Sequence, residues 1–155
     1  MTTGTTETGT YYFYNKKDQD IPIVFIHGVG LTYEIWQPQL EFFKNYSTLS
    51  YDILGHGKSS LNKDNITFDD FSDQLIDLID HLKIKKIHVV GFSIGSLIAR
   101  NFGTKFSDRL KSLTLLCSIY KRSEEQQKIV NQRFEQAKKE LKLSKQALKR
   151  WFTDK

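Results

Sequence analysis

The chain has 155 residues, of which 39% are hydrophobic, 13% aromatic and 26% charged. These proportions are typical of a soluble globular domain and exclude a wholly disordered chain. No apolar run approaches the ~18 residues that span a bilayer, and the first ten residues have neither region of a secretory signal. The single cysteine, Cys117, cannot form an internal disulfide and fits a reducing compartment, so we expect a cytoplasmic protein.

The net charge of +5 belongs to the end of the chain. Residues 1–120 hold 12 Lys/Arg and 13 Asp/Glu, whereas residues 121–155 hold 11 Lys/Arg and 5 Asp/Glu. A basic excess of this kind is typical of a solvated helix face. Contact with nucleic acid or an anionic membrane surface is the sharper alternative. No arginine-rich run, zinc-ligand spacing or aromatic RNA-binding motif supports it, and we expect neither partner.

The first 120 residues alternate predicted strands with predicted helices. Residues 1–9 are rich in Thr and Gly and are expected to be a flexible N-terminus. The predicted strands are short apolar runs, and the predicted helices repeat apolar residues at helical spacing. In chain order they are strands at 11–14 and 21–26, a helix at 33–43, a strand at 47–53, a helix at 68–82, a strand at 87–90, a helix at 96–106 and a strand at 113–117. The alternation favours an α/β fold with a mostly parallel sheet and flanking helices.

Beyond residue 118 the pattern becomes helical. Ser123 and Gln126 have the spacing of a capping box, and apolar residues recur at helical spacing from 129 to 141. A second amphipathic segment follows Ser144 and contains Ala147, Leu148, Trp151 and Phe152. We therefore expect two helices to end the chain, with no return to a strand.

The segment Gly91-Phe-Ser93-Ile-Gly95 has the G-x-S-x-G pattern of a serine nucleophile on a sharp strand-to-helix turn. It lies between a predicted strand and a predicted helix, which is the context that this turn requires. Glycines are expected at positions 91 and 95 because side chains there would collide with neighbouring backbone. An ordinary serine in a βα turn is the simpler alternative.

The segment His27-Gly28-Val29-Gly30 ends the strand at 21–26 in a loop of small residues. Acyl transfer needs two backbone N–H groups aimed at the developing oxyanion. Ile94 would supply one from a helix N-terminus, and Val29 is placed to supply the other. A phosphate-binding glycine loop is the alternative, but Tyr33 occupies the third position of a G-x-G-x-x-G, and no G-x-x-x-x-G-K-[ST] occurs.

Together these motifs resemble the α/β-hydrolase superfamily, in particular its esterase, enol-lactonase and carboxylesterase-like members. The residues that carry the resemblance are His27-Gly-Val-Gly30, Trp36, Tyr51-Asp-Ile-Leu-Gly-His-Gly-Lys-Ser59 and Gly91-Phe-Ser-Ile-Gly95. The resemblance implies a partial α/β-hydrolase core at residues 10–120 and the start of a helical cap at 121–155. A serine at the nucleophile position, rather than an aspartate, argues against haloalkane dehalogenase or epoxide hydrolase chemistry.

The resemblance also implies roles for individual residues. Ser93 would be the nucleophile, Val29 and Ile94 the oxyanion-hole residues, and His27 the residue that orders the oxyanion loop. The glycines in supporting positions are Gly28, Gly91 and Gly95. No metal ligands are apparent, and the chemistry needs no cofactor.

The same resemblance implies an acid and then a histidine after the serine. The four histidines all precede Ser93, at positions 27, 56, 81 and 88. No later acid follows a predicted strand where the family places one. His27 or His56 as a substitute base is the alternative. We expect an incomplete α/β-hydrolase fold, the N-terminal portion of a larger hydrolase, arising from a truncated gene, a fragmentary gene model or the boundary of an expressed fragment.

The sequence thus predicts a serine hydrolase acting on a carboxylic ester or lactone, here without the acid and base of its triad. Its partner would be a small-molecule substrate. An uncovered hydrophobic edge at residues 113–117 would also favour self-association. The alternative function is a non-catalytic small-molecule binding or interaction module on a hydrolase-like scaffold, with apolar residues of the last helices lining its pocket or docking on a partner.

Overall fold

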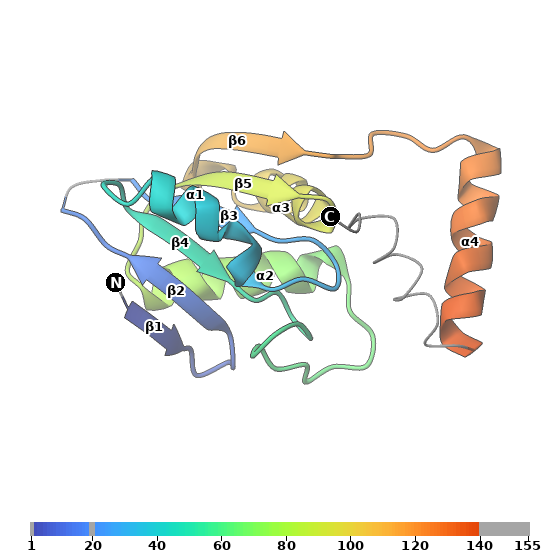
Figure 1. Ribbon diagram of the computed structural model, residues 1–155, viewed down its shortest axis with the longest axis horizontal. Helices are drawn as coiled ribbons and strands as arrows, with labels where there is room; N and C mark the ends of the chain where they lie inside the picture. Colours follow the sequence, from blue (N-terminus) through green and yellow to red (C-terminus); the bar gives the residue numbers. More distant parts are fainter. Residues whose placement is uncertain (1, 19–20, 140–155) are drawn as a thin grey trace, which may run out of the picture. The chain divides into compact units, whose positions relative to one another are not determined.

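The computed structural model describes residues 2–18 and 21–139, and the chain divides into two compact units, residues 1–118 and 119–155. The first unit holds a six-stranded sheet with the order β1-β2-β4-β3-β5-β6 (Figure 1). The strands are β1 (Thr2–Thr5), β2 (Tyr11–Asn15), β3 (Ile23–Ile26), β4 (Thr48–Tyr51), β5 (Ile87–Phe92) and β6 (Leu110–Leu116). The helices of this unit are η1 (Tyr33–Trp36), α1 (Gln37–Phe42), α2 (Phe68–His81), α3 (Ile94–Lys105) and η2 (Ser107–Arg109).

Four of the six strands form the parallel part of the sheet. β3 pairs in parallel with β4 and with β5, and β5 pairs in parallel with β6. Among the described strands, β1 with β2 and β2 with β4 pair antiparallel. The predicted α/β fold with a mostly parallel sheet and flanking helices is therefore confirmed.

The N-terminus differs from the expectation of a flexible segment. Residues Thr2–Thr5 form β1, which pairs antiparallel with β2 along its whole length. The connecting turn is closed by hydrogen bonds between Thr6 and Thr10, and Gly9 supplies a backbone φ of +85°. The threonines that suggested a frayed end are β-branched residues, which favour a strand once a partner strand is available.

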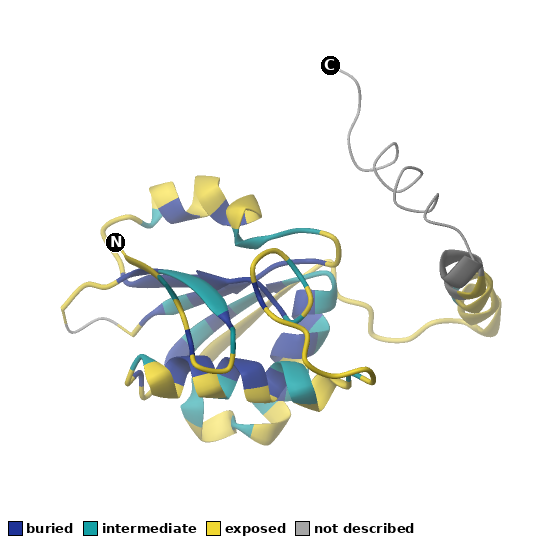
Figure 2. Ribbon diagram, turned by 90° about the horizontal axis from the view of Figure 1, so that it is seen from below, coloured by how far each residue is buried: buried dark blue, intermediate teal, exposed yellow. Residues whose placement is uncertain are grey.

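The two faces of the sheet are covered unequally. Helices α2 and α3 lie against one face, whereas η1 and the short α1 lie over the other (Figure 2). The α2/α3 face buries a cluster of fifteen residues, among them Leu78, Val89 and Phe102, which are fully buried. On the α1 face the buried hydrophobic cluster of the described residues is smaller, with Phe25, Trp36 and Leu40.

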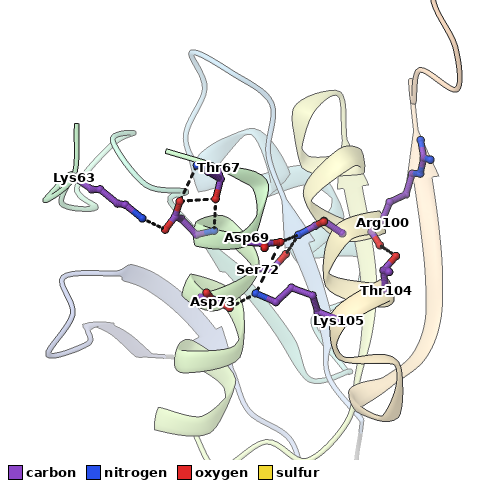
Figure 3. A network of polar contacts seen from close by, with 10 residues as sticks. Lys63, Thr67, Asp69, Ser72, Asp73, Arg100, Thr104 and Lys105 are labelled. Carbon is purple, nitrogen blue, oxygen red and sulfur yellow. Dashed lines mark hydrogen bonds and ion pairs between the residues drawn. The ribbon is translucent and has the colours of Figure 1, made fainter. Parts of the chain in front are cut away.

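Polar contacts join the two helices of the well-covered face. Asn101 on α3 donates to the Asp69 carboxylate (2.8 Å) and to the Ser72 hydroxyl (3.0 Å) on α2. The Lys105 ammonium lies 2.8 Å from the Asp73 carboxylate (Figure 3). Helix α2 itself begins with the capping box of Thr67 and Asp70, in which side chain and backbone satisfy each other.

In the second unit the structure describes one helix, α4 (Glu124–Lys139). Its start has the predicted capping box, because the Ser123 amide donates to Gln126 and the Gln126 amide donates to the Ser123 hydroxyl. The second predicted tail helix, with Ala147, Leu148, Trp151 and Phe152, lies outside the described residues. None of the described helices has the length and apolarity needed to cross a bilayer.

Candidate active site

Ser93 is the single residue between β5 and α3. Its backbone has φ 56° and ψ −119°, a conformation that residues with a Cβ rarely adopt. A positive φ at a residue other than glycine costs about 1–3 kcal/mol and persists only where the surrounding structure enforces it. The sharp strand-to-helix turn that the G-x-S-x-G motif predicts is therefore present, with a half-buried serine at its apex.

The two glycines that flank this turn permit the close approach of backbone segments. A Cβ added at Gly91 would collide with the carbonyl group of Gly95 and with the Cα of Ser96. A Cβ added at Gly95 would collide with the Ile26 carbonyl and lie 2.7 Å from the His27 oxygen. Every colliding atom belongs to the backbone, so side-chain rotation cannot relieve the clash. Helix α3 thus begins directly against the end of β3.

The loop after β3 lies beside the serine. A Cβ added at Gly28 would lie 3.3 Å from the Cβ of Ser93. Val29 follows with half of its surface exposed, and Gly30 turns the chain with φ +73°. Ile94 is the first residue of α3, so its N–H has no acceptor within the helix. The structure therefore brings together the two segments that carry the predicted oxyanion donors, Val29 and Ile94.

His27 is fully buried, and both of its ring nitrogens are engaged. The Ile53 N–H donates to Nε2 (3.1 Å), and Nδ1–H donates to the Gly28 carbonyl (2.8 Å). Burial lowers the pKa of the imidazole, with a smaller lowering from His56, against raising contributions from the Gly28 carbonyl and from Asp52. The ring is therefore neutral and fixed in one tautomer. It connects the loop after β3 to the segment that follows β4.

Asp52 forms hydrogen bonds with the chain segments that surround His27. It is 1% exposed, and its carboxylate accepts hydrogen bonds from the backbone amides of Tyr33 and Lys58, each at 2.8 Å. The Ser59 hydroxyl donates to its backbone carbonyl at 2.6 Å. The segment that begins η1 at Tyr33 and the loop at Lys58 are thereby held together at the carboxyl end of the parallel strands, next to His27.

Sequence reasoning missed Gln74, which lies 5% exposed on α2. Its amide oxygen accepts from the Leu54 N–H (3.0 Å), and its amide nitrogen donates to the carbonyl of Asp52 (3.1 Å) and to the hydroxyl of Thr10 (3.2 Å). The available signal was a polar residue within the apolar stripe of an amphipathic helix. Such a residue must find hydrogen-bond partners when it is buried.

The histidines do not pair with the serine. Among the described residues no hydrogen bond is formed by Ser93 Oγ, and the substitute-base interpretation of His27 conflicts with its two engaged nitrogens. His56 lies beside His27, with ring centroids 5.4 Å apart, and its Nδ1 is 3.0 Å from the Leu54 carbonyl. His88 bonds to Ser112 at 2.7 Å, and His81 packs its ring against Tyr12.

In the first unit one acid follows Ser93 among the described residues, Asp108, and no hydrogen bond between it and the serine is described. Asp108 lies in η2, and Glu124 and Glu125 lie in the first turn of α4. Glu140 and Asp154 are outside the described residues. The described part of the chain also holds no group of three or more His, Cys, Asp or Glu side chains able to bind a metal ion.

Comparison with known proteins identifies the family of this chain. Residues 21–149 match the α/β-hydrolase fold family. The chain is 35% identical over 140 residues to (E)-2-((N-methylformamido)methylene)succinate hydrolase of Acinetobacter baylyi, covering 90% of this chain and 53% of that protein. It is 37% identical over 118 residues to a non-heme chloroperoxidase of Kitasatospora aureofaciens, covering 74% and 43%.

A solved structure shows the same similarity in three dimensions. The enol-lactonase of Burkholderia xenovorans superimposes with a TM-score of 0.62 at 26% identity, over 65% of this chain and 40% of that one. The chain spans about half the length of the relatives that it matches. On the family match, the identities and the shared sheet, the chain belongs to the α/β-hydrolase fold family.

Proposed function

We propose that this chain carries the nucleophile side of a serine hydrolase that acts on a carboxylic ester or lactone. The observation that carries the proposal is Ser93, held at positive φ between a buried strand and a helix N-terminus. Relatives that include a hydrolase and an enol-lactonase support the class of reaction. The whole protein's activity and its substrate remain part of the proposal, because the match covers only about half of each relative.

In the proposed reaction Ser93 Oγ attacks the carbonyl carbon, its proton passes to a base from outside the described contacts of the serine, and the carbonyl oxygen becomes an oxyanion. Collapse of this intermediate breaks the ester C–O bond, releases the alcohol group and leaves an acyl-serine, which water then hydrolyses to the acid. The backbone N–H groups of Val29 and Ile94 would hold that oxyanion, and the α3 N-terminus favours its negative charge. His27 positions Gly28 and Val29 through the Gly28 carbonyl and does not take the proton. A serine without a base is a weak nucleophile, so this chain by itself would react slowly.

Labelling with a fluorophosphonate probe tests the proposal, because the probe reacts covalently with activated serines. We expect slow labelling at Ser93, abolished in Ser93→Ala. Ser112→Ala is the matched control, since Ser112 is the serine that hydrogen bonds to a histidine. Labelling that disappears in Ser112→Ala and persists in Ser93→Ala would refute the assignment.

A second candidate function is supported by the absence of a base among the described contacts of Ser93. The scaffold would then hold a small molecule without converting it. Saturable binding of an ester or lactone that is unchanged in Ser93→Ala, with no hydrolysis in either protein, would establish it. Loss of that binding together with loss of probe labelling in Ser93→Ala would instead favour the catalytic site.

Three further expectations belong to the proposal. The substrate is a small molecule, the reaction uses no metal or cofactor, and the single cysteine suggests a reducing, cytoplasmic compartment. The exposed edge of β6 also favours self-association.

A further inference from the structure

One peptide unit, which joins Asp52 to Ile53, lies beside the buried ring of His27. Its N–H, from Ile53, donates to His27 Nε2 at 3.1 Å. Its carbonyl, from Asp52, accepts two hydrogen bonds, from the Gln74 amide nitrogen at 3.1 Å and from the Ser59 hydroxyl at 2.6 Å. These five residues are each at most 8% exposed, so their hydrogen bonds are shielded from water. The peptide unit is therefore hydrogen bonded at both of its ends inside the fold.

The partners of Gln74 determine the orientation of its side-chain amide. The Leu54 N–H can only donate, so the atom that it faces at 3.0 Å is the amide oxygen. The amide nitrogen therefore faces the Asp52 carbonyl, which can only accept, and it also donates to the Thr10 hydroxyl at 3.2 Å. From helix α2, Gln74 thus holds two consecutive peptide units of the segment that follows β4.

The hydrogen bonds at the two ends of this peptide unit strengthen each other. Donation to a peptide carbonyl polarises the whole unit, which makes its N–H a better donor. Gln74 and Ser59 therefore strengthen the hydrogen bond that the same unit donates to His27 Nε2. Because Nε2 accepts, the ring proton stays on Nδ1, where it donates to the Gly28 carbonyl at 2.8 Å. The residue after Gly28 is Val29, the proposed oxyanion donor.

We propose that Gln74 and Ser59 are positioning residues for the loop that carries Val29. Through the shared peptide unit they hold the His27 ring neutral and hydrogen bonded to that loop. Neither side chain touches the substrate in this arrangement, because each acts through the backbone after β4. The inference rests on the proposed function, in which the Val29 N–H holds the oxyanion.

Protonation of His27 is the event that this arrangement opposes. A second ring proton would lie on Nε2 and meet the Ile53 N–H donor to donor, so that hydrogen bond would be lost. A weaker bond from Ile53 opposes protonation less, and the ring should then take up its proton at a higher pH. Among the described groups, His56 and Asp52 also act electrostatically on the ring. Both remain in place when Gln74 or Ser59 is replaced, so a change between variants reports on the peptide unit.

The titration of His27, followed by the NMR chemical shifts of its ring nitrogens, tests the proposal. The variant His27→Gln identifies its resonances. Gln74→Met keeps the length of the side chain but removes its donor and its acceptor, so we expect the midpoint to rise by about half a pH unit. Ser59→Ala removes the other donor to the same carbonyl and should shift the midpoint in the same direction.

Thr10→Val is the matched control for this titration. It removes the third hydrogen bond of Gln74 and leaves both donors to the Asp52 carbonyl in place, so the midpoint of His27 should not move. An unchanged midpoint in a folded Gln74→Met or Ser59→Ala variant would overturn the proposal. A rise of the same size in Thr10→Val would also overturn it, because Gln74 would then act by joining α2 to the N-terminal hairpin. Circular dichroism verifies that each variant is folded.

The rate of fluorophosphonate labelling at Ser93 separates this inference from the proposed function. We expect labelling about tenfold slower in Gln74→Met and in Ser59→Ala, and unchanged in Thr10→Val, because a displaced oxyanion donor stabilises the transition state less. Equal rates in all variants would refute the positioning role and leave the proposed function intact. No labelling of Ser93 in the unaltered chain would refute the proposed function and the role of the loop in it, while the titration would still decide whether the two residues hold the ring.

Discussion

The two faces of the sheet are buried to different extents by the helices that cover them. The face under α2 and α3 is sealed by apolar burial, with Leu75, Leu78, Ile98 and Phe102 fully inaccessible. The face under α1 has a buried hydrophobic cluster of three described residues, and a hollow of about 480 Å³ opens beside them, lined in part by Phe43, Val90 and Thr114. There hydrogen bonds to Asp52 and His27 hold the loops in addition to this packing. The two faces of the sheet thus differ chiefly in the amount of apolar surface that their helices bury.

The largest difference between the faces should appear in matched leucine truncations. Leu78 on α2 is fully buried, and Leu40 on α1 is 6% exposed beside the open hollow. Leu78→Ala leaves a cavity that close-packed neighbours cannot fill, so we expect a loss of about 4–5 kcal/mol of unfolding free energy, against about 2 kcal/mol for Leu40→Ala. Urea denaturation monitored by circular dichroism measures both. Equal losses would show that α1 is as tightly packed as α2.

A second contrast compares two glycine substitutions. Gly95→Ala drives a Cβ into the Ile26 carbonyl, and we expect a loss of about 3 kcal/mol because α3 must move away from the sheet. Gly30 has φ +73° but no atom within 4 Å of an added Cβ, so Gly30→Ala carries only the conformational cost of about 1 kcal/mol. Thermal unfolding ranks the two variants. A Gly30→Ala variant as unstable as Gly95→Ala would mean that the β3 loop is also confined.

Helix caps on the two faces should differ in the same direction. Thr67 and Thr32 each accept a backbone N–H at 3.4 Å, from Asp70 and Glu34. At α2 the Asp70 carboxylate completes a capping box by accepting from the Thr67 N–H and hydroxyl, each at 2.7 Å, and no such return bond is described at η1. We expect Thr67→Ala to cost about 1 kcal/mol and Thr32→Ala a few tenths. Chemical denaturation resolves this difference when both variants are measured in parallel. A larger loss for Thr32→Ala would contradict the expectation that stability depends more on the cap of α2 than on the cap of η1.

The smallest expected effect is a pH dependence from His27, which lies in the loop after β3. Burial lowers the pKa of His27 below that of an unfolded histidine, about 6.5. The unfolded chain therefore binds the proton more tightly, so the contribution to stability is fully present above pH ~6.5 and is lost as the pH falls toward the lower, folded-state value. His27→Gln, which retains an acceptor for Ile53, should flatten this part of the pH profile. An unchanged slope between pH ~6.5 and pH ~5 would assign the dependence to other groups.

The predictability of each part follows from where its determinants lie in the sequence. Strands β3 and β5 are continuous apolar runs, and the turn at Ser93 is encoded by glycines two positions on either side, so local pattern was sufficient. Strand β1 was missed because threonine and glycine specify a strand only through pairing with β2. Residues Asp52 and Gln74 converge on one backbone segment from separate elements, and only the folded topology reveals their contact. Strand β6 begins three residues earlier than the apolar pattern suggested, because pairing with β5 extends over Leu110–Ser112.

The positive φ of Ser93 determines which substitutions at position 93 would stabilise the fold. Glycine at that position would remove a steric cost of about 1–3 kcal/mol, more than the roughly 1 kcal/mol of chain entropy that glycine adds to the unfolded state. Threonine keeps the hydroxyl but adds a branch at the Cβ, where the backbone already lies in a disfavoured region. In a laboratory population selected for thermal stability alone, glycine should therefore replace serine at position 93. Retention of serine would then mark selection for chemistry, which makes this one position a readout of whether a population is evolving for folding or for function.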